Sequence, residues 1–179
     1  AQLFRDPETP GTHVSYRVAR TCATPKALLS GHHDAWTTAH AISWGPPRYR
    51  TTFTAVWNDA GMAARFDAID DRPWHTMIRH DDPIWEEEVV EIFLDPTRSG
   101  GHYAEVEISP INIVTDLHIV APWPHMENVR GWDWTGLEST VIPGAAFGLP
   151  GGSWIALAWL PWSGLAAMTP VVSPLVPPA

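Results

Sequence analysis

The sequence predicts an all-β protein folded as an antiparallel β-sandwich. Roughly seven short segments rich in β-forming residues follow one another at regular spacing. Almost none of the chain shows the 3.6-residue period of an amphipathic helix. The 18 prolines also favour many short elements joined by turns over long helices. A lipocalin-like barrel is the alternative arrangement of the same strands.

The elements expected in the first half of the chain are strands separated by turns. Residues 13–20 are a strand candidate, and residues 31–36 (Gly-His-His-Asp-Ala-Trp) are expected to turn and to end in an anchoring tryptophan. Residues 51–57 are rich in β-formers and residues 62–68 alternate between two faces, so both are predicted strands. Between them, Asn-Asp-Ala-Gly at 58–61 is a hairpin turn signal.

Four more strands are expected in the second half. Residues 88–94 and 103–109 alternate between two faces and are joined by a loop that contains two adjacent glycines. Residues 113–120 are a further candidate. Residues 154–160 are almost wholly apolar, which fits a central strand covered on both faces.

Length and composition fit a single domain over residues 1–179, with an irregular, Pro-rich tail at 169–179. The net charge is −9 and Lys26 is the only lysine, which disfavours nucleic-acid binding by phosphate neutralisation. The only cysteine, Cys22, cannot form an internal disulfide. The sequence has no apolar run of about 18 residues that would span a membrane. Its first residues do not read as a signal peptide.

The hairpin made by the two alternating strands of the second half gathers carboxylates on one face. Its antiparallel register is expected to place Glu91 across from Glu107, and Phe93 across from Glu105. Carboxylates this close repel one another unless a cation, a proton or hydroxyl donors lie between them. Sugar hydroxyls are such donors, so the three glutamates are candidate carbohydrate-binding residues. The alternatives are a solvated outer sheet face and, for Glu91, a buried structural acid.

Tryptophan is the second informative residue type. The 11 tryptophans exceed the needs of a core of this size, and Trp is amphipathic and frequent at binding surfaces. Trp85 lies just before three glutamates, so we expect its ring to be exposed for stacking on a sugar and those glutamates to be solvated. Trp132, Trp134 or Trp123 would supply a second ring. Trp57, Trp154 and Trp159 lie in strand patterns and are expected in the core.

Loop-adjacent carboxylates raise the question of a metal ion, because oxygen ligands of this kind suit Ca²⁺. The pairs His32-His33 and His75…His80 lack a zinc-site spacing, and no acidic run has the spacing of an EF-hand loop. A structural Ca²⁺ is therefore expected without assigned ligands. Its candidates are Asp67, Asp70, Asp71, Asp81, Asp82 and Asp95.

Catalytic signatures are weak in this sequence. It has no Gly-x-Ser-x-Gly motif and no phosphate-binding glycine loop followed by a lysine. Glu87 and Glu91 resemble a glycosidase pair only in being two carboxylates, and they lie on one short segment. We therefore expect a binding protein rather than an enzyme.

The chain resembles the family 9 carbohydrate-binding modules. Besides residues 31–36, the resemblance rests on residues 57–70, on Arg-His-Asp-Asp-Pro-Ile-Trp-Glu-Glu-Glu-Val-Val-Glu-Ile-Phe-Leu-Asp-Pro at 79–96, on Tyr-Ala-Glu-Val-Glu-Ile-Ser-Pro at 103–110 and on residues 154–162. It implies a sandwich of jelly-roll type, often with bound Ca²⁺, that binds sugars, frequently at the reducing ends of plant polysaccharides. It also implies an exported protein that accompanies a glycoside hydrolase or another envelope protein.

The resemblance assigns sugar stacking to Trp85 and hydrogen bonds to Glu91, with help from Glu105 or Glu107. The chain departs from its relatives at Leu157, where they usually carry a carboxylate. Relatives also tend to continue into a strand containing Arg and Asn, whereas this chain stops at Ala179. Two alternatives stay open. One is an interaction module whose sugar site has decayed. The other is a haem-binding relative of the same fold, whose candidate ligands here would be Met77, Met126 and Lys26.

Overall fold

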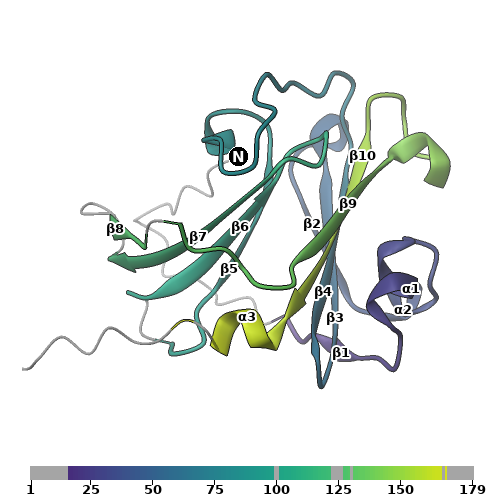
Figure 1. Ribbon diagram of the computed structural model, residues 1–179. Helices are drawn as coiled ribbons and strands as arrows, with labels where there is room; N and C mark the ends of the chain where they lie inside the picture. The colour runs from purple at the N-terminus through teal and green to yellow at the C-terminus, as the bar shows by residue number, and fades with distance from the viewer. Residues whose placement is uncertain (1–15, 99–100, 122–126, 130, 167, 169–179) are drawn as a thin grey trace, which may run out of the picture.

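The computed structural model describes residues 16–98, 101–121, 127–129, 131–166 and 168. Within these ranges, ten strands form two sheets that pack face to face (Figure 1). The first sheet contains β1 (Ala19–Arg20), β2 (Ala41–Trp44), β3 (Thr51–Asn58), β4 (Gly61–Ala68), β9 (Glu138–Pro143) and β10 (Trp154–Pro161). The second contains β5 (Val90–Leu94), β6 (Tyr103–Ile108), β7 (Val114–Ala121) and β8 (Glu127–Asn128).

The order of the strands shows how the chain moves between the layers. In the first sheet the order is β1-β3-β4-β10-β9, with β2 paired to β3, and in the second it is β5-β6-β7-β8. The chain leaves the first sheet after β4 and returns to it at β9. All pairings are antiparallel except the two-residue pairing of β1 with β3. This confirms the predicted antiparallel β-sandwich, since the described strands form two sheets and not one closed barrel.

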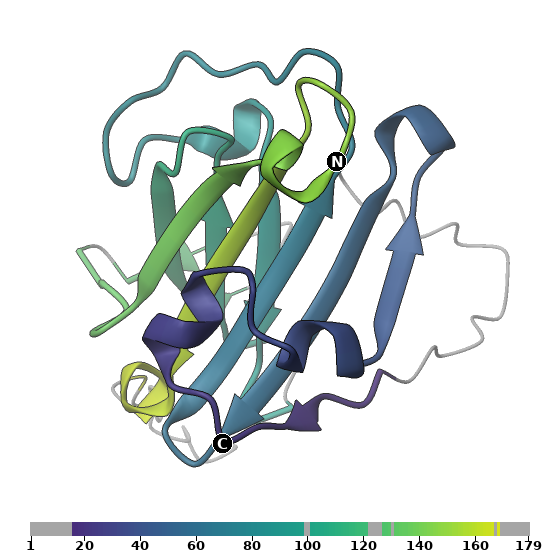
Figure 2. The same ribbon diagram turned by 90° about the vertical axis from the view of Figure 1, so that its right-hand side faces the viewer.

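Strand β10 is the centre of the first sheet and belongs to two hydrophobic cores. It pairs with β4 on one side and with β9 on the other. Its even-numbered residues from Trp154 to Leu160 enter the core between the two sheets, and its odd-numbered residues face the opposite way. The helices α1 (Pro25–Leu29) and α2 (Ala35–Thr38) lie over that second face (Figure 2). The prediction of a central strand covered on both faces is therefore confirmed.

The two short helices are held by the turn between them. The hydroxyl of Thr24 accepts the N–H of Ala27 and caps α1, and the indole N–H of Trp36 donates to the carbonyl of Leu28 at 3.0 Å. Gly31 has φ +76°, and a Cβ there would lie 2.8 Å from the Phe147 ring. The anchoring tryptophan was predicted from the sequence, whereas the helices were not. No helix in the described part of the chain is long and apolar enough to cross a membrane.

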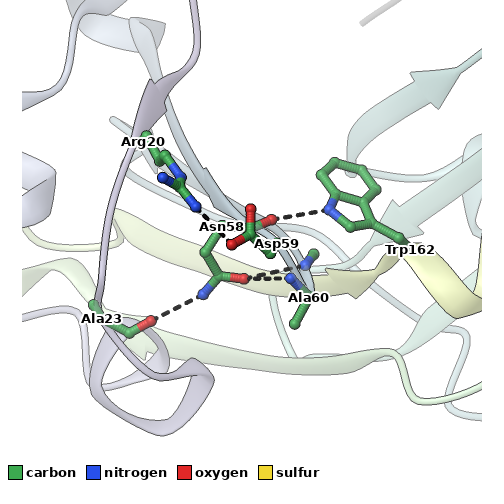
Figure 3. Close-up of polar contacts among 7 residues, drawn as sticks. Arg20, Ala23, Asn58, Asp59, Ala60 and Trp162 are labelled. Atoms are coloured by element: carbon green, nitrogen blue, oxygen red, sulfur yellow. Dashed lines mark hydrogen bonds and ion pairs between the residues drawn. The ribbon is translucent and has the colours of Figure 1, made fainter.

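The predicted hairpin at 58–61 is present and is bonded to three other segments (Figure 3). The Oδ1 of Asn58 accepts the N–H of Ala60 at 2.9 Å, and its Nδ2 donates to the carbonyl of Ala23 at 3.2 Å. The indole of Trp162 donates to the backbone carbonyl of Asn58 at 2.9 Å. Asp59 forms an exposed ion pair with Arg20 at 2.6 Å. This turn is therefore bonded to β1, to the segment that leads from β1 to α1, and to helix α3 (Trp162–Ala166).

The alternating pattern of the second sheet decides what lies outside the sandwich. Val90 and Ile92 of β5 and Ala104, Val106 and Ile108 of β6 enter the core between the sheets. The residues between them therefore point to the outer face. That outer face carries Glu91, Phe93, Tyr103, Glu105 and Glu107.

Candidate functional site

Three glutamates from two adjacent strands meet on the outer face of the second sheet. The register is the predicted one: Glu91 lies opposite Glu107, and Phe93 lies opposite Glu105. One carboxylate oxygen from each of Glu91, Glu105 and Glu107 lies within 4.8 Å of the other two. Glu107 is 0% exposed, Glu105 is buried and Glu91 is partly exposed. We call these three residues the glutamate cluster; it runs from the surface into a closed interior.

The loop between β4 and β5 is what buries Glu107. Its 3-10 helix η2 (Ile84–Glu86) packs against β6, with the side chain of Ile84 fully buried. Thr115 of β7 lies opposite Glu107 and donates its hydroxyl to the carbonyl of Asp82 at 2.6 Å. An outer sheet face is usually solvated, but here this loop covers it.

Burial governs the charge of the glutamate cluster. Desolvation raises the pKa of Glu107 to about 9, and the neighbouring carboxyl group of Glu105 adds to this rise. The nearby backbone N–H of Trp85 acts in the opposite sense on the pKa of Glu107. Desolvation also raises the pKa of Glu105 and of Glu91. When nothing else neutralises the cluster, it therefore retains a proton at neutral pH.

Aromatic side chains surround this carboxylate face. Trp85 lies on η2 and is 47% exposed, and its backbone approaches Glu107. Phe93 is exposed beside Tyr103, with ring centroids 5.7 Å apart. Sequence reasoning placed Phe93 and Tyr103 on this face by strand parity but did not count them as site residues. The signal that could have included them is that shared parity with Glu91 and Glu105.

The three glutamates after Trp85 have different environments. Glu86 is exposed, as expected. The carboxylate of Glu87 accepts the backbone N–H of Thr76 at 2.8 Å and that of the next residue, and the carboxylate of Glu88 accepts the backbone N–H of Trp74 at 2.7 Å. Glu87 and Glu88 are partly exposed, and their carboxylates also bind the loop backbone, which the expectation of three solvated glutamates did not include. Glu87 is engaged in this way and does not join Glu91 in the glutamate cluster.

The structure places Trp132 and Trp134 on the other side of the second sheet. Trp134 is 3% exposed in the core between the sheets, and its backbone N–H donates to the buried carboxylate of Asp116. Trp132 packs against it, with ring centroids 6.0 Å apart. Because Asp116 pairs with the inward-facing Val106, both rings lie on the core side of the sheet. They do not face Trp85 across a sugar site. Trp123 lies outside the described residues.

The six acidic candidates for a shared Ca²⁺ site are dispersed. Asp71 forms an ion pair with Arg48 near the surface. Asp67 pairs with Arg65 at 2.9 Å. Within the described ranges, the groups of three or more residues that could hold a metal ion include only Asp81 of the six. The remaining three carboxylates accept backbone N–H groups of nearby residues: Asp70 from Arg72, Asp82 from Ile78 and Arg79, and Asp95 from Thr97. The sequence-based candidates thus do not surround one common point.

Asp81 belongs instead to a second cluster, with His80, Asp116 and Asp133. The Nε2 of His80 lies 3.2 Å from Asp133, 3.4 Å from Asp81 and 3.6 Å from Asp116. Desolvation acts to lower the pKa of His80, but the three carboxylates outweigh it and the pKa is raised. Protonated His80 thus neutralises part of this cluster from within.

Residues of the same loop also line a separate pocket of about 400 Å³. Tyr49 and Trp74, which are both exposed, line it together with Glu87 and Glu88. Sequence reasoning did not single out Trp74, although it follows a proline in the same loop as Trp85. Trp74 is therefore a natural comparison for Trp85 in binding experiments.

Comparison with known proteins supports the fold. No protein-family model matches the chain, and no curated protein matches it. A crystal structure of a Bacteroides uniformis protein, provisionally named a carbohydrate-binding protein, superposes with a TM-score of 0.63 at 12% sequence identity. The match covers 85% of this chain and 74% of the other. The similarity is thus one of architecture: the chain has the fold of that protein.

Proposed function

We propose that this protein is a non-catalytic carbohydrate-binding domain of the family 9 type, with Trp85 as the stacking platform and Glu91 as the hydroxyl acceptor. The observation that carries the proposal is an exposed tryptophan presented beside a face of convergent carboxylates. A sugar ring has an apolar C–H face and a hydroxyl rim, so it needs both kinds of contact. The fold shared with a protein provisionally named carbohydrate-binding agrees with this.

Burial distinguishes the roles of the three glutamates. Glu91 is partly exposed, so a hydroxyl at the surface can reach it. Glu107 is fully buried and can act on a sugar only through its neighbours. A charge-assisted hydrogen bond sheltered from water contributes about 1.5–3 kcal/mol. We therefore assign direct recognition to Glu91 and Trp85, and a supporting role to Glu105 and Glu107.

The proposed domain binds its ligand without cleaving it and accompanies a glycoside hydrolase or another envelope protein outside the cytoplasm. The engagement of Glu87 with the loop backbone supports a binding role, because a glycosidase needs two free carboxyl groups at one bond. Haem binding has less support. Lys26 lies on α1 over the first sheet, whereas the backbone of Met77 is bonded to Glu87 just before the second. Met126 lies outside the described residues.

The test is calorimetric titration of monosaccharides and oligosaccharides chosen from a glycan array. Trp85→Ala is expected to lower the affinity at least tenfold, because the stacking surface is lost. Trp74→Ala is the matched control, since Trp74 is an exposed tryptophan of the same loop at 56% exposure. If Trp85→Ala bound as well as the wild type and Trp74→Ala did not, the site would lie at the other pocket. Absence of binding to any sugar would contradict the proposed function itself.

A further inference from the structure

We propose that the glutamate cluster is a binding site for one divalent cation, with Ca²⁺ as its occupant and Glu91, Glu105 and Glu107 as its protein ligands. This site lies apart from every acidic residue that the sequence suggested for calcium. The cation would bind whether or not a sugar is present, so the inference goes beyond the proposed function.

The side chain of Glu107 is the first reason. It is fully buried, and neither of its carboxylate oxygens has a hydrogen-bond partner among the described residues. Buried polar atoms almost always have a partner, and an orphaned buried carboxylate calls for an ion or a water. One of these oxygens lies within 4.8 Å of carboxylate oxygens of Glu91 and Glu105. The unpartnered group therefore points into the cluster and not into apolar packing.

The spacing of the oxygens is the second reason. Ca²⁺ binds oxygen ligands at about 2.3–2.6 Å, so two ligands of one ion lie at most about 5 Å apart. The three glutamate oxygens satisfy this limit. Ca²⁺ takes about 6–8 oxygen ligands. Three carboxylates therefore leave positions for water or for other oxygen donors, which could enter at the partly exposed Glu91.

The third reason is a comparison with the cluster around His80, which contains a positively charged partner that the glutamate cluster lacks. The carboxylates of Asp81, Asp116 and Asp133 surround His80, whose ring is a positive partner when protonated. Among the described residues, no Lys, Arg or His side chain forms an ion pair with a member of the glutamate cluster. A proton shared by Glu105 and Glu107 is the competing way to neutralise it. A cation replaces that proton and gives a partner to the Glu107 oxygen that enters the cluster.

The experiment uses the whole chain, stripped with EDTA and titrated with calcium chloride in the absence of sugar. Calorimetry should give one cation per chain with a dissociation constant below about 1 mM, and saturating calcium should raise the melting temperature by several degrees. Glu107→Gln keeps the shape of the buried side chain and should weaken calcium binding at least tenfold. Asp133→Asn, in the second cluster, is the matched control and should bind calcium like the wild type.

Two results would contradict the proposed cation site. The wild type could show neither heat nor a thermal shift up to about 10 mM calcium. Alternatively, Asp133→Asn could lose calcium binding while Glu107→Gln keeps it, which would place the ion at His80. The wild-type titration decides the matter even if a variant fails to fold. Sugar binding measured separately in EDTA distinguishes the two proposals. Sugar binding without calcium binding contradicts only the cation site, and calcium binding without sugar binding contradicts only the proposed function.

Discussion

At the scale of single residues, the sequence predicted which glutamates share a face but not how deeply they lie. Strand period and the antiparallel turn were enough to place Glu91 opposite Glu107. Glu107 lies on β6, against which η2 packs with its fully buried Ile84, and η2 belongs to a loop about twenty residues away in the sequence. A local sequence pattern does not predict that a distant loop packs over a strand. For the same reason the sequence did not predict that Glu87 and Glu88 bind the loop backbone.

The pair Asp70 and Glu88 allows a residue-scale test of pH dependence. Desolvation and then the hydrogen bond to Asp70 raise the pKa of Glu88 from 4.5 to about 7. A carboxyl whose pKa is raised by folding contributes stability below its unfolded pKa, and this contribution is lost as the pH rises through the folded pKa. Wild-type stability at this site should therefore fall between about pH 4.5 and 7. Glu88→Gln cannot titrate and should not show that fall.

The measurement is urea unfolding of wild type and Glu88→Gln at about pH 5 and pH 8, with the difference in unfolding free energy as the readout. Contributions from the other titrating groups cancel in that difference. The unfolding free energy of Glu88→Gln should increase relative to that of the wild type as the pH rises. The lowered pKa of Asp70 concerns a more acidic range, since its contribution is lost as the pH falls below 3.8. An equal difference at both pH values would contradict a neutral, proton-sharing Glu88.

At the scale of elements, the loop between β4 and β5 contributes Trp85 to the candidate site, and its packing over β6 was the least predictable feature of the site. Long alternating strands such as β3, β4 and β6 were predicted from period and β-propensity. The four-residue β2 and the two-residue β8 are too short to show a period. The edge strand β9 (Glu138–Pro143) is only partly buried, so its pattern carries little signal. Its pairing with β10 depends on contacts that only the assembled sheet provides.

The bond from Thr115 to Asp82 is expected to hold this loop over the glutamate cluster. Thr115→Val keeps the shape of the side chain but removes the hydroxyl, so the Asp82 carbonyl loses this hydrogen-bond donor. Loss of a buried hydrogen bond of this kind costs about 1–3 kcal/mol. Amide hydrogen exchange should therefore quicken at Glu86 and Glu87, whose N–H groups bond within η2.

Thr115→Ser is the control for this experiment, because it keeps the hydroxyl and should keep the slow exchange. A uniform loss of protection across the second sheet in Thr115→Val would show that the bond stabilises the whole sheet and not the loop. Unchanged exchange at both amides would show that Ile84 packing alone holds the loop in place.

At the scale of the whole molecule, the two hydrophobic cores are joined through the first sheet. Trp154 and Leu160 of β10 contribute to the core between the sheets, whereas Ile155 and Leu157 contribute to the core beneath α1 and α2. The outer face of the second sheet has no helical layer of this kind in the described part of the chain, and it carries the glutamate cluster. The sandwich thus covers the outer face of one sheet with helices and presents the candidate site on the outer face of the other, beneath the loop between β4 and β5.

This arrangement predicts that a cavity in the core beneath α1 and α2 lowers the stability of the whole molecule, which still unfolds in one transition. Leu157 is fully buried there, and Leu157→Ala should lower the free energy of unfolding by about 2–5 kcal/mol. Because adjacent residues of β10 enter both cores, far-UV circular dichroism and tryptophan fluorescence should report one shared transition at a lower urea midpoint. Ile78→Ala, at 70% exposure, removes a similar side chain from the surface and should change stability by less than about 0.5 kcal/mol. Two separate transitions in Leu157→Ala would show that the helical layer unfolds independently of the sandwich.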